Sequence, residues 1–288
     1  MSALKYAVHA YAWTGHWSND TLPIIDRAKR IGFDAVEIPL MEPDDVDPDA
    51  IRRRAADAGV ELCCSTACGP GTDVTHDDRS VREAGLAYLE RCVDLTADMG
   101  ASVFSGVIYS AIGGRVGGLP ADEHWRRSAD ALRQVARHAA GRGVTIGIEP
   151  VNRYETFLVN TGAQAMRLAE MTGEPNVAVH LDAYHMNIEE TDFYTPTLTA
   201  APRLCHFHMS ESHRGTPGAG TVDWTEIYRG LADGGYHGLV GLESFVEVAP
   251  AMQAATCIWR PLAESSDQLL TDGLAYLRAL EQVIYHRV

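Results

Sequence analysis

Short apolar runs alternate with amphipathic stretches along the whole chain. Six of these runs follow a glycine that ends a helix-like stretch, in the segments RIGFDAVEIPL, DAGVELCCSTA, DMGASVFSGVIY, GRGVTIGIEPV, TGEPNVAVHLD and DGGYHGLVGLESF. Glycine just beyond a helix adopts the left-handed conformation that ends the helix. The runs are apolar on both faces, which is typical of parallel strands covered by helices. Two more runs, LKYAVHAYAW and RLCHFHMSES, bring the predicted strands to eight.

The stretches between the strands predict helices, and the two kinds of element together predict the fold. One stretch spaces its apolar residues like one face of a helix; these are Trp125, Ala129, Leu132, Ala136 and Ala139. Eight alternating units in 288 residues predict an α/β protein, a (β/α)8 TIM barrel that residues 1–288 form as one catalytic domain. A doubly wound sheet is the structural alternative. No GxGxxG motif follows the first strand, which argues against a dinucleotide-binding fold.

Charge and composition narrow the classes of partner. The formal net charge of −15 disfavours nucleic acid and anionic membrane surfaces as partners. No apolar stretch approaches the roughly 18 residues of a membrane span, and the first residues lack the apolar core of a signal peptide. We therefore expect a cytoplasmic protein without a membrane partner. Its cysteines are expected to be reduced thiols, mostly within the core: Cys63, Cys64, Cys68, Cys92, Cys205 and Cys257.

Charged side chains stand at the ends of four consecutive predicted strands. Glu149 ends the fifth strand, Asp182 ends the sixth, and Glu243 ends the eighth, while the seventh carries His206 and His208. In a barrel, the carboxyl ends of the strands surround one mouth, so these groups are expected to converge. Each alone has a simpler explanation, because a lone glutamate often forms an ion pair and an aspartate before a helix often caps it.

Convergence of these groups predicts a metal site. An unpaired buried carboxylate is very unfavourable, and few Lys or Arg residues lie nearby in sequence. A mixed set of carboxylates and one histidine suits Mn²⁺, Co²⁺ or Mg²⁺ better than zinc. His206 and His208 point the same way, about 6.6 Å apart, so the strand pattern leaves open which of them is the ligand.

Three further polar residues follow the strand ends. Glu155 lies six residues beyond Glu149, His185 three beyond Asp182, and Arg214 six beyond the last histidine of the seventh strand. All three are expected on loops over the mouth, where they could bind a polyol by hydrogen bonds. A solvated surface position is the alternative for each one taken singly. The glycine-rich segment after Arg214 is interpreted as a covering loop.

The segments EPVNRYET, LDAYHMNIEE, HMSESHRGTPGAG and GLESF resemble signature segments of the ketose 3-epimerases, a family of xylose isomerase-like TIM barrels. Its members include D-tagatose, D-allulose (D-psicose) and L-ribulose 3-epimerases. The resemblance extends over nearly the whole chain, including VIYSA and IWRPL. It implies an isomerase that inverts C3 of a free ketose: D-fructose/D-allulose, D-tagatose/D-sorbose or L-ribulose/L-xylulose.

The resemblance also implies a role for each site residue. Glu149, Asp182, His208 and Glu243 are the implied ligands of one divalent metal ion, Mn²⁺ before Co²⁺ or Mg²⁺. Glu149 and Glu243 are the implied catalytic pair, which would remove and return the C3 proton through a metal-stabilised enediolate.

The substrate contacts that the resemblance implies are Glu155, His185, Arg214 and, in a more variable position, His9. A homodimer or homotetramer is implied as well. Ala183 and Pro150 depart from the Thr and Val that many members carry beside the ligands, which puts the substrate preference in doubt.

Other functions stay open on the sequence alone. An aldose–ketose isomerase or a hydroxypyruvate isomerase would use the same barrel. An inosose dehydratase and a non-catalytic sugar- or metal-binding protein are further alternatives. An endonuclease of this superfamily would need more metal ligands and a basic surface, against which the net charge argues.

Overall fold

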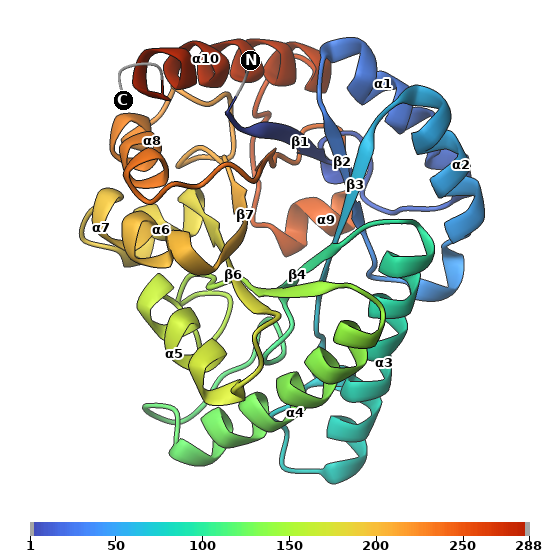
Figure 1. The fold of residues 1–288 in the computed structure, drawn as a ribbon, viewed down its shortest axis with the longest axis vertical. Coiled ribbons are helices and arrows are strands. Elements are labelled where there is room, and N and C mark those ends of the chain that lie inside the picture. Colours follow the sequence, from blue (N-terminus) through green and yellow to red (C-terminus); the bar gives the residue numbers. More distant parts are fainter. Residues whose placement is uncertain (1–2, 286–288) are drawn as a thin grey trace.

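Eight parallel strands close into a barrel in the computed structural model, which describes residues 3–285 (Figure 1). Each strand pairs with its neighbour in sequence, and the last pairs with the first. The eight predicted strands are confirmed, and the closed barrel excludes the doubly wound alternative. The strands are β1 (Lys5–His9), β2 (Ala35–Pro39), β3 (Glu61–Ala67), β4 (Val103–Val107), β5 (Thr145–Ile148), β6 (Val177–Asp182), β7 (Leu204–His208) and β8 (Leu239–Leu242).

Helices surround the barrel, and α9 lies across it in the view of Figure 1. They are α1 (Pro23–Ile31), α2 (Pro48–Ala58), α3 (Arg79–Asp98), α4 (Asp122–Gly141), α5 (Gly162–Thr172), α6 (Ala183–Glu189), α7 (Tyr194–Ala200), α8 (Trp224–Asp233), α9 (Pro250–Ala255) and α10 (Ser266–Tyr285). Short 3-10 helices lie at Ala10–Ala12, Asn19–Thr21, Pro43–Asp45, Pro70–Thr72 and Ala201–Arg203.

Local signals in the sequence account for the ends and faces of the helices. Gly32 and Gly59 end α1 and α2 with φ of 109° and 64°, values that a side chain would disfavour. The predicted apolar face of α4 packs inward. Its buried residues include all five members of the predicted stripe: Trp125, Ala129, Leu132, Ala136 and Ala139.

The interior of the barrel changes from apolar to polar along its axis. Ala7, Ala35 and Cys63 pack together at the end where the strands begin. One layer further on, Glu37, His180 and His206 are completely buried. This polar layer lies between the apolar end and the mouth, where the strands end.

No helix within residues 3–285 is long and apolar enough to cross a membrane. All six cysteines are free thiols, of which four are buried and one is half-buried; Cys257 is exposed.

Glu281 of α10 binds the first described residues of the chain by hydrogen bonds. One of its carboxylate oxygens accepts hydrogen bonds from the backbone N–H groups of Ala3 and Leu4. The other accepts from the hydroxyl of Tyr6, 3.0 Å away, which also lies 3.0 Å from the hydroxyl of Tyr228. This carboxylate therefore joins β1, α8 and α10 at the end of the barrel opposite the mouth.

We expect Glu281→Gln to lower the free energy of unfolding by about 1–3 kcal/mol, because an amide has one acceptor oxygen where the carboxylate uses two. Urea unfolding followed by circular dichroism measures the change. Glu83→Gln is the control, because Glu83 forms an exposed ion pair with Arg79 on one helix, a kind of pair that contributes little. Equal stability of Glu281→Gln and the wild-type protein would contradict the assigned role of Glu281.

Candidate active site

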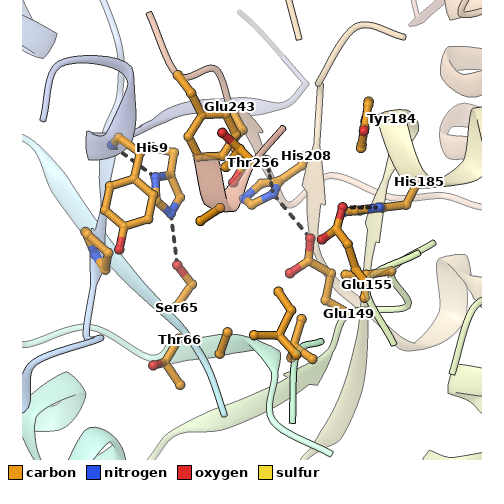
Figure 2. A pocket seen from close by; sticks show the side chains of 18 of the residues that line it. His9, Ser65, Thr66, Glu149, Glu155, Tyr184, His185, His208, Glu243 and Thr256 are labelled. Carbon is orange, nitrogen blue, oxygen red and sulfur yellow. Dashed lines mark hydrogen bonds and ion pairs between the residues drawn. The ribbon is translucent and has the colours of Figure 1, made fainter. Parts of the chain in front are cut away.

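A cavity of about 220 Å³ opens at the mouth of the barrel, where the strands end (Figure 2). It is lined by side chains from the strand ends, from the loops that follow them and from α6, and by Met252, Ala255 and Thr256 at α9. Asp182 is completely buried behind the cavity wall. The other predicted site residues all line the cavity: His9, Glu149, Glu155, His185, His208, Arg214 and Glu243.

Three of the four predicted metal ligands, all carboxylates, converge on a nitrogen atom of the fourth, His208. Nδ1 of His208 lies 3.6 Å from Oε1 of Glu149, 3.7 Å from Oδ2 of Asp182 and 3.6 Å from Oε2 of Glu243. Asp182 and His208 end adjacent strands and are paired in register. None of the described residues forms a hydrogen bond with this buried nitrogen. Three carboxylate oxygens at nearly equal distances from an unpartnered imidazole nitrogen fit a divalent cation.

The two histidines of β7 lie in different layers. His208 reaches the mouth, whereas His206 lies one layer deeper, beside His180. The strand pattern alone did not distinguish them, and the layer now does. Only His208 faces the three carboxylates of the mouth.

Burial and neighbouring charges shift the pKa values of the three carboxyl groups at the mouth in different directions. Burial raises the pKa of Glu149, and it raises the pKa of Glu243 to about 6. Burial also acts on Asp182, but the positive charge of Arg214 outweighs it and lowers the pKa of Asp182. Asp182 is therefore the most firmly ionised of the three.

Asp182 has two structural roles because its two oxygens face different ways. Its Oδ1 accepts a hydrogen bond of 2.7 Å from the backbone N–H of Tyr184 and so caps α6. Its Oδ2 faces His208 and accepts a hydrogen bond of 2.9 Å from Arg214. The capping explanation weighed for this residue is therefore correct, and it leaves one oxygen for the site.

Arg214 links the acidic groups to an aromatic wall. Its Nη1 donates to Asp182, to Glu243 and to the hydroxyl of Ser210. Its guanidinium carbon lies 3.9 Å from the centre of the Tyr184 ring. The backbone φ of Arg214 is 62°, in the left-handed region that non-glycine residues seldom adopt. Such a conformation at a charged residue inside a cavity is typical of a functional position.

Glu211 holds the loop that carries Arg214, a role that no local sequence pattern indicates. Its carboxylate accepts hydrogen bonds from the backbone N–H groups of Ser212, Gly218 and Val222 and from the indole of Trp224, at 2.8 to 3.2 Å. The covering loop is therefore organised around one buried carboxylate.

His185 lies on helix α6, so the prediction that it lies on a loop is wrong. Asp182 caps a helix that begins at Ala183, so His185 falls within its first turn. Nδ1 of His185 accepts hydrogen bonds from the backbone and side-chain N–H groups of Asn152, at 3.1 and 2.9 Å. The ring proton is therefore on Nε2, which lies 3.4 Å from Arg214 and can donate into the cavity.

Asn152 also contacts Glu155 and was missed at the sequence level, although it lies within the segment VNRYE. Its amide donates to Oε1 of Glu155 at 2.8 Å. Asn152 thus fixes two of the predicted substrate contacts, Glu155 and His185, from a single buried position.

His9 is presented on the far side of the cavity from His185 (Figure 2). Its Nδ1 accepts from the backbone N–H of Tyr11 at 3.1 Å, so its Nε2 faces the hydroxyl of Ser65 at 3.2 Å as a donor. Burial lowers the pKa of His9 to about 4, which keeps the ring neutral near pH 7.

Glu37 is a buried residue beside the site that was not predicted from the sequence. It lies within the apolar run AVEIP, where an acidic residue among buried strand residues was the available signal. Its Oε2 lies 2.8 Å from Nε2 of both His206 and His208. Burial opposes its ionisation, but the surrounding histidines outweigh burial and lower its pKa.

Comparisons with known proteins agree with this fold and show the family of the chain. The chain belongs to the Xylose isomerase-like TIM barrel family, whose model matches residues 25–280. A ketose 3-epimerase of Arthrobacter globiformis is 38% identical over 278 residues, 96% of each chain. An L-ribulose 3-epimerase of a Methylomonas species is 34% identical, covering 96% of this chain and 97% of its own.

A solved structure extends the comparison to three dimensions. The crystal structure of a D-allulose 3-epimerase from Methylomonas in complex with D-allulose has a TM-score of 0.92 and 34% identity, covering 97% of this chain and 98% of its own. This chain belongs to the ketose 3-epimerase family and is a carbohydrate epimerase. The resemblance seen in the motifs is thereby confirmed.

Glu211→Ala should loosen the loop over residues 211–224, because three backbone N–H groups and the indole of Trp224 lose their acceptor. We expect the amides of Gly218 and Val222 to exchange about tenfold faster or more with deuterium, measured by mass spectrometry. Asp223→Asn is the matched control, since asparagine caps α8 as well as aspartate does. Unchanged exchange in Glu211→Ala would show that other contacts hold the loop.

Proposed function

We propose that the protein is a metal-dependent ketose 3-epimerase that inverts C3 of a free ketose. The observation that carries the proposal is the unpartnered Nδ1 of His208, which faces the carboxylates of Glu149, Asp182 and Glu243 among the described residues. The same four residues would hold one divalent ion, Mn²⁺ in preference to Co²⁺ or Mg²⁺. Bound there, the ion would supply positive charge beside the oxygens on C2 and C3 of the sugar.

Two glutamates supply the proton chemistry in this proposal. The C3–H bond of a ketose is adjacent to the C2 carbonyl, so one carboxylate removes that proton and an enediolate forms. A carboxylic acid on the opposite face then returns a proton to C3 and inverts it. Glu149 and Glu243 follow β5 and β8 and lie on different sides of the His208 ring (Figure 2), which supports this division of work.

The remaining polar residues orient the reacting end of the sugar. Arg214 and the Nε2–H of His185 are donors suited to the oxygens on C1 and C2. Glu155 accepts from a sugar hydroxyl, and its half-exposed position at the rim supports this role. His9 is a neutral donor at the other end of the cavity. These residues would contact the C2–C3 unit of the sugar. The same unit is present in D-fructose/D-allulose, D-tagatose/D-sorbose and L-ribulose/L-xylulose.

Assembly and location are part of the proposal. Trp259 is 76% exposed, beside Ile258 and Leu262. A large exposed apolar side chain of this kind supports a homodimer or homotetramer. The free thiols support a reducing, cytoplasmic location for residues 1–288, acting as one catalytic domain.

A solvent-exchange assay tests the reaction. The Mn²⁺-loaded protein is incubated in D₂O with D-fructose, D-allulose, D-tagatose or L-ribulose, and the sugars are followed by NMR. We expect deuterium at C3, appearance of the C3 epimer, loss of both after treatment with EDTA, and recovery on adding Mn²⁺. Deuterium at C1 with an aldose product would identify an aldose–ketose isomerase instead. Full activity after complete removal of the metal would contradict the metal dependence.

Substitution of the two glutamates tests the proton carriers. Glu149→Gln and Glu243→Gln should each reduce kcat by about 10²–10⁴-fold at saturating Mn²⁺, because an amide can neither accept nor return the C3 proton. Initial rates of epimerisation, with bound Mn²⁺ measured in the same samples, separate this effect from loss of the metal. Glu170→Gln on the exposed face of α5 is the control. A variant with bound Mn²⁺ and wild-type kcat would exclude that glutamate as a proton carrier.

A further inference from the structure

A polar cluster lies inside the barrel, beneath the three carboxylates of the mouth. Its members are Glu37 on β2, His180 on β6 and His206 on β7, and all three are completely buried. Branched apolar side chains usually fill this part of a TIM barrel. Apolar replacements of a buried charged group are often as stable or more stable, so stability does not explain a carboxylate here. The position of Glu37 directly below His208 suggests a role in the site.

The hydrogen bond to Glu37 selects one tautomer of His208. Oε2 of Glu37 lies 2.8 Å from Nε2 of His208, and a carboxylate oxygen can only accept. Nε2 must therefore carry a proton, and in the neutral ring Nδ1 then has a free lone pair. Nδ1 is the atom that faces Glu149, Asp182 and Glu243. With the proton on Nδ1 instead, the ring would donate to a carboxylate and could not bind a metal through that atom.

The neighbours of the His208 ring pack against it, whereas Glu37 forms the hydrogen bond to its Nε2. The ring of His180 meets His208 edge-on, with centroids 4.1 Å apart. A Cβ atom at Gly241 on β8 would lie 3.4 Å from the His208 ring and 3.0 Å from the His206 ring, so the absence of a side chain there makes room for both. Nε2 of His206 also lies 2.8 Å from Oε2 of Glu37, so both histidines contact the same carboxylate oxygen and help to hold it in place.

We propose that Glu37 is a positioning residue, which accepts the Nε2–H of His208 and so holds Nδ1 unprotonated and directed at the metal. This role rests on the proposed function, because it requires a metal ion at His208. Glu37 does not belong to the residues that line the cavity, so it acts through His208 and not on the sugar.

Metal affinity tests this role without using activity. Metal-free wild-type, Glu37→Gln and Glu281→Gln proteins are titrated with Mn²⁺ by calorimetry at one pH. We expect Glu37→Gln to bind Mn²⁺ about 10- to 100-fold more weakly, the usual effect of removing a group that orients a metal-binding histidine. Glu281→Gln is the matched control, because it replaces another buried carboxylate at the opposite end of the barrel and should leave the Kd unchanged.

The outcomes separate the two proposals. A Kd of Glu37→Gln within twofold of the wild-type value would overturn the role of Glu37 and leave the metal site intact. Equal weakening in Glu281→Gln would overturn it too, because the effect would then be one of general stability. A wild-type protein that binds no Mn²⁺ would overturn both the metal dependence and this role.

A measurement on the unmodified protein covers the case in which Glu37→Gln does not fold. In Mg²⁺-loaded wild-type protein labelled with ¹⁵N-histidine, NMR should show His208 with its proton on Nε2. Loss of the corresponding signals in His208→Asn assigns them. A proton on Nδ1 of His208 would overturn the inference directly.

Discussion

The site depends on the balance of buried charge around the ring of His208. Four carboxylates surround this ring. Glu37 and Asp182 are completely buried, Glu149 is buried, and the side chain of Glu243 is 11% exposed. Arg214 is the one Lys or Arg among the residues that line the cavity, all of which lie in the described part of the chain. Buried carboxylates without compensating charge are strongly unfavourable. A divalent cation would add two positive charges at the point where the carboxylates meet, so charge balance favours a metal more than any single distance does.

Hydrogen bonds around the loop of Arg214 hold its backbone in a strained conformation. A left-handed conformation at a non-glycine residue costs about 1–3 kcal/mol and persists only where its surroundings fix it. The hydroxyl of Ser244 donates to the carbonyl of Arg214 at 2.6 Å, and Glu211 fixes the rest of the loop. The guanidinium is thereby placed before any substrate arrives, and an oriented positive charge is most effective when no reorganisation is needed during the reaction.

The sequence predicted the parts of the fold and site that depend on local patterns. Glycines after helices and apolar runs identified all eight strands, and the strand ends identified Glu149, Asp182 and Glu243. Glu37 was missed because its partners lie 169 and 171 positions away along the chain, and no local pattern reports such a contact.

One wrong prediction and one open choice have equally physical causes. His185 was expected on a loop because a capping aspartate and a site aspartate were treated as alternatives, whereas Asp182 is both. The choice between His206 and His208 was open because alternation along a strand gives the face and not the depth. Depth is set by the register of β7 against β6 and β8, which only the closed barrel determines.

Under the proposed function, the cavity would treat the reacting end of a ketose and its remaining carbons differently. The charged groups gather at Glu149, His185 and Arg214, and His9 and Ser65 are hydrogen-bonding groups across the cavity. Apolar surface comes from Met41, Val107, Ile112, Phe245 and Met252. An apolar wall discriminates between sugars mainly by shape, and differences of shape in such pockets amount to only about 1–3 kcal/mol. A site that fixes C2 and C3 by charge and the remaining carbons by shape would therefore accept several ketoses with graded rates. In the proposed function, the strand ends would therefore carry the reaction, and the loops and α9 that complete the wall would set the preference among sugars.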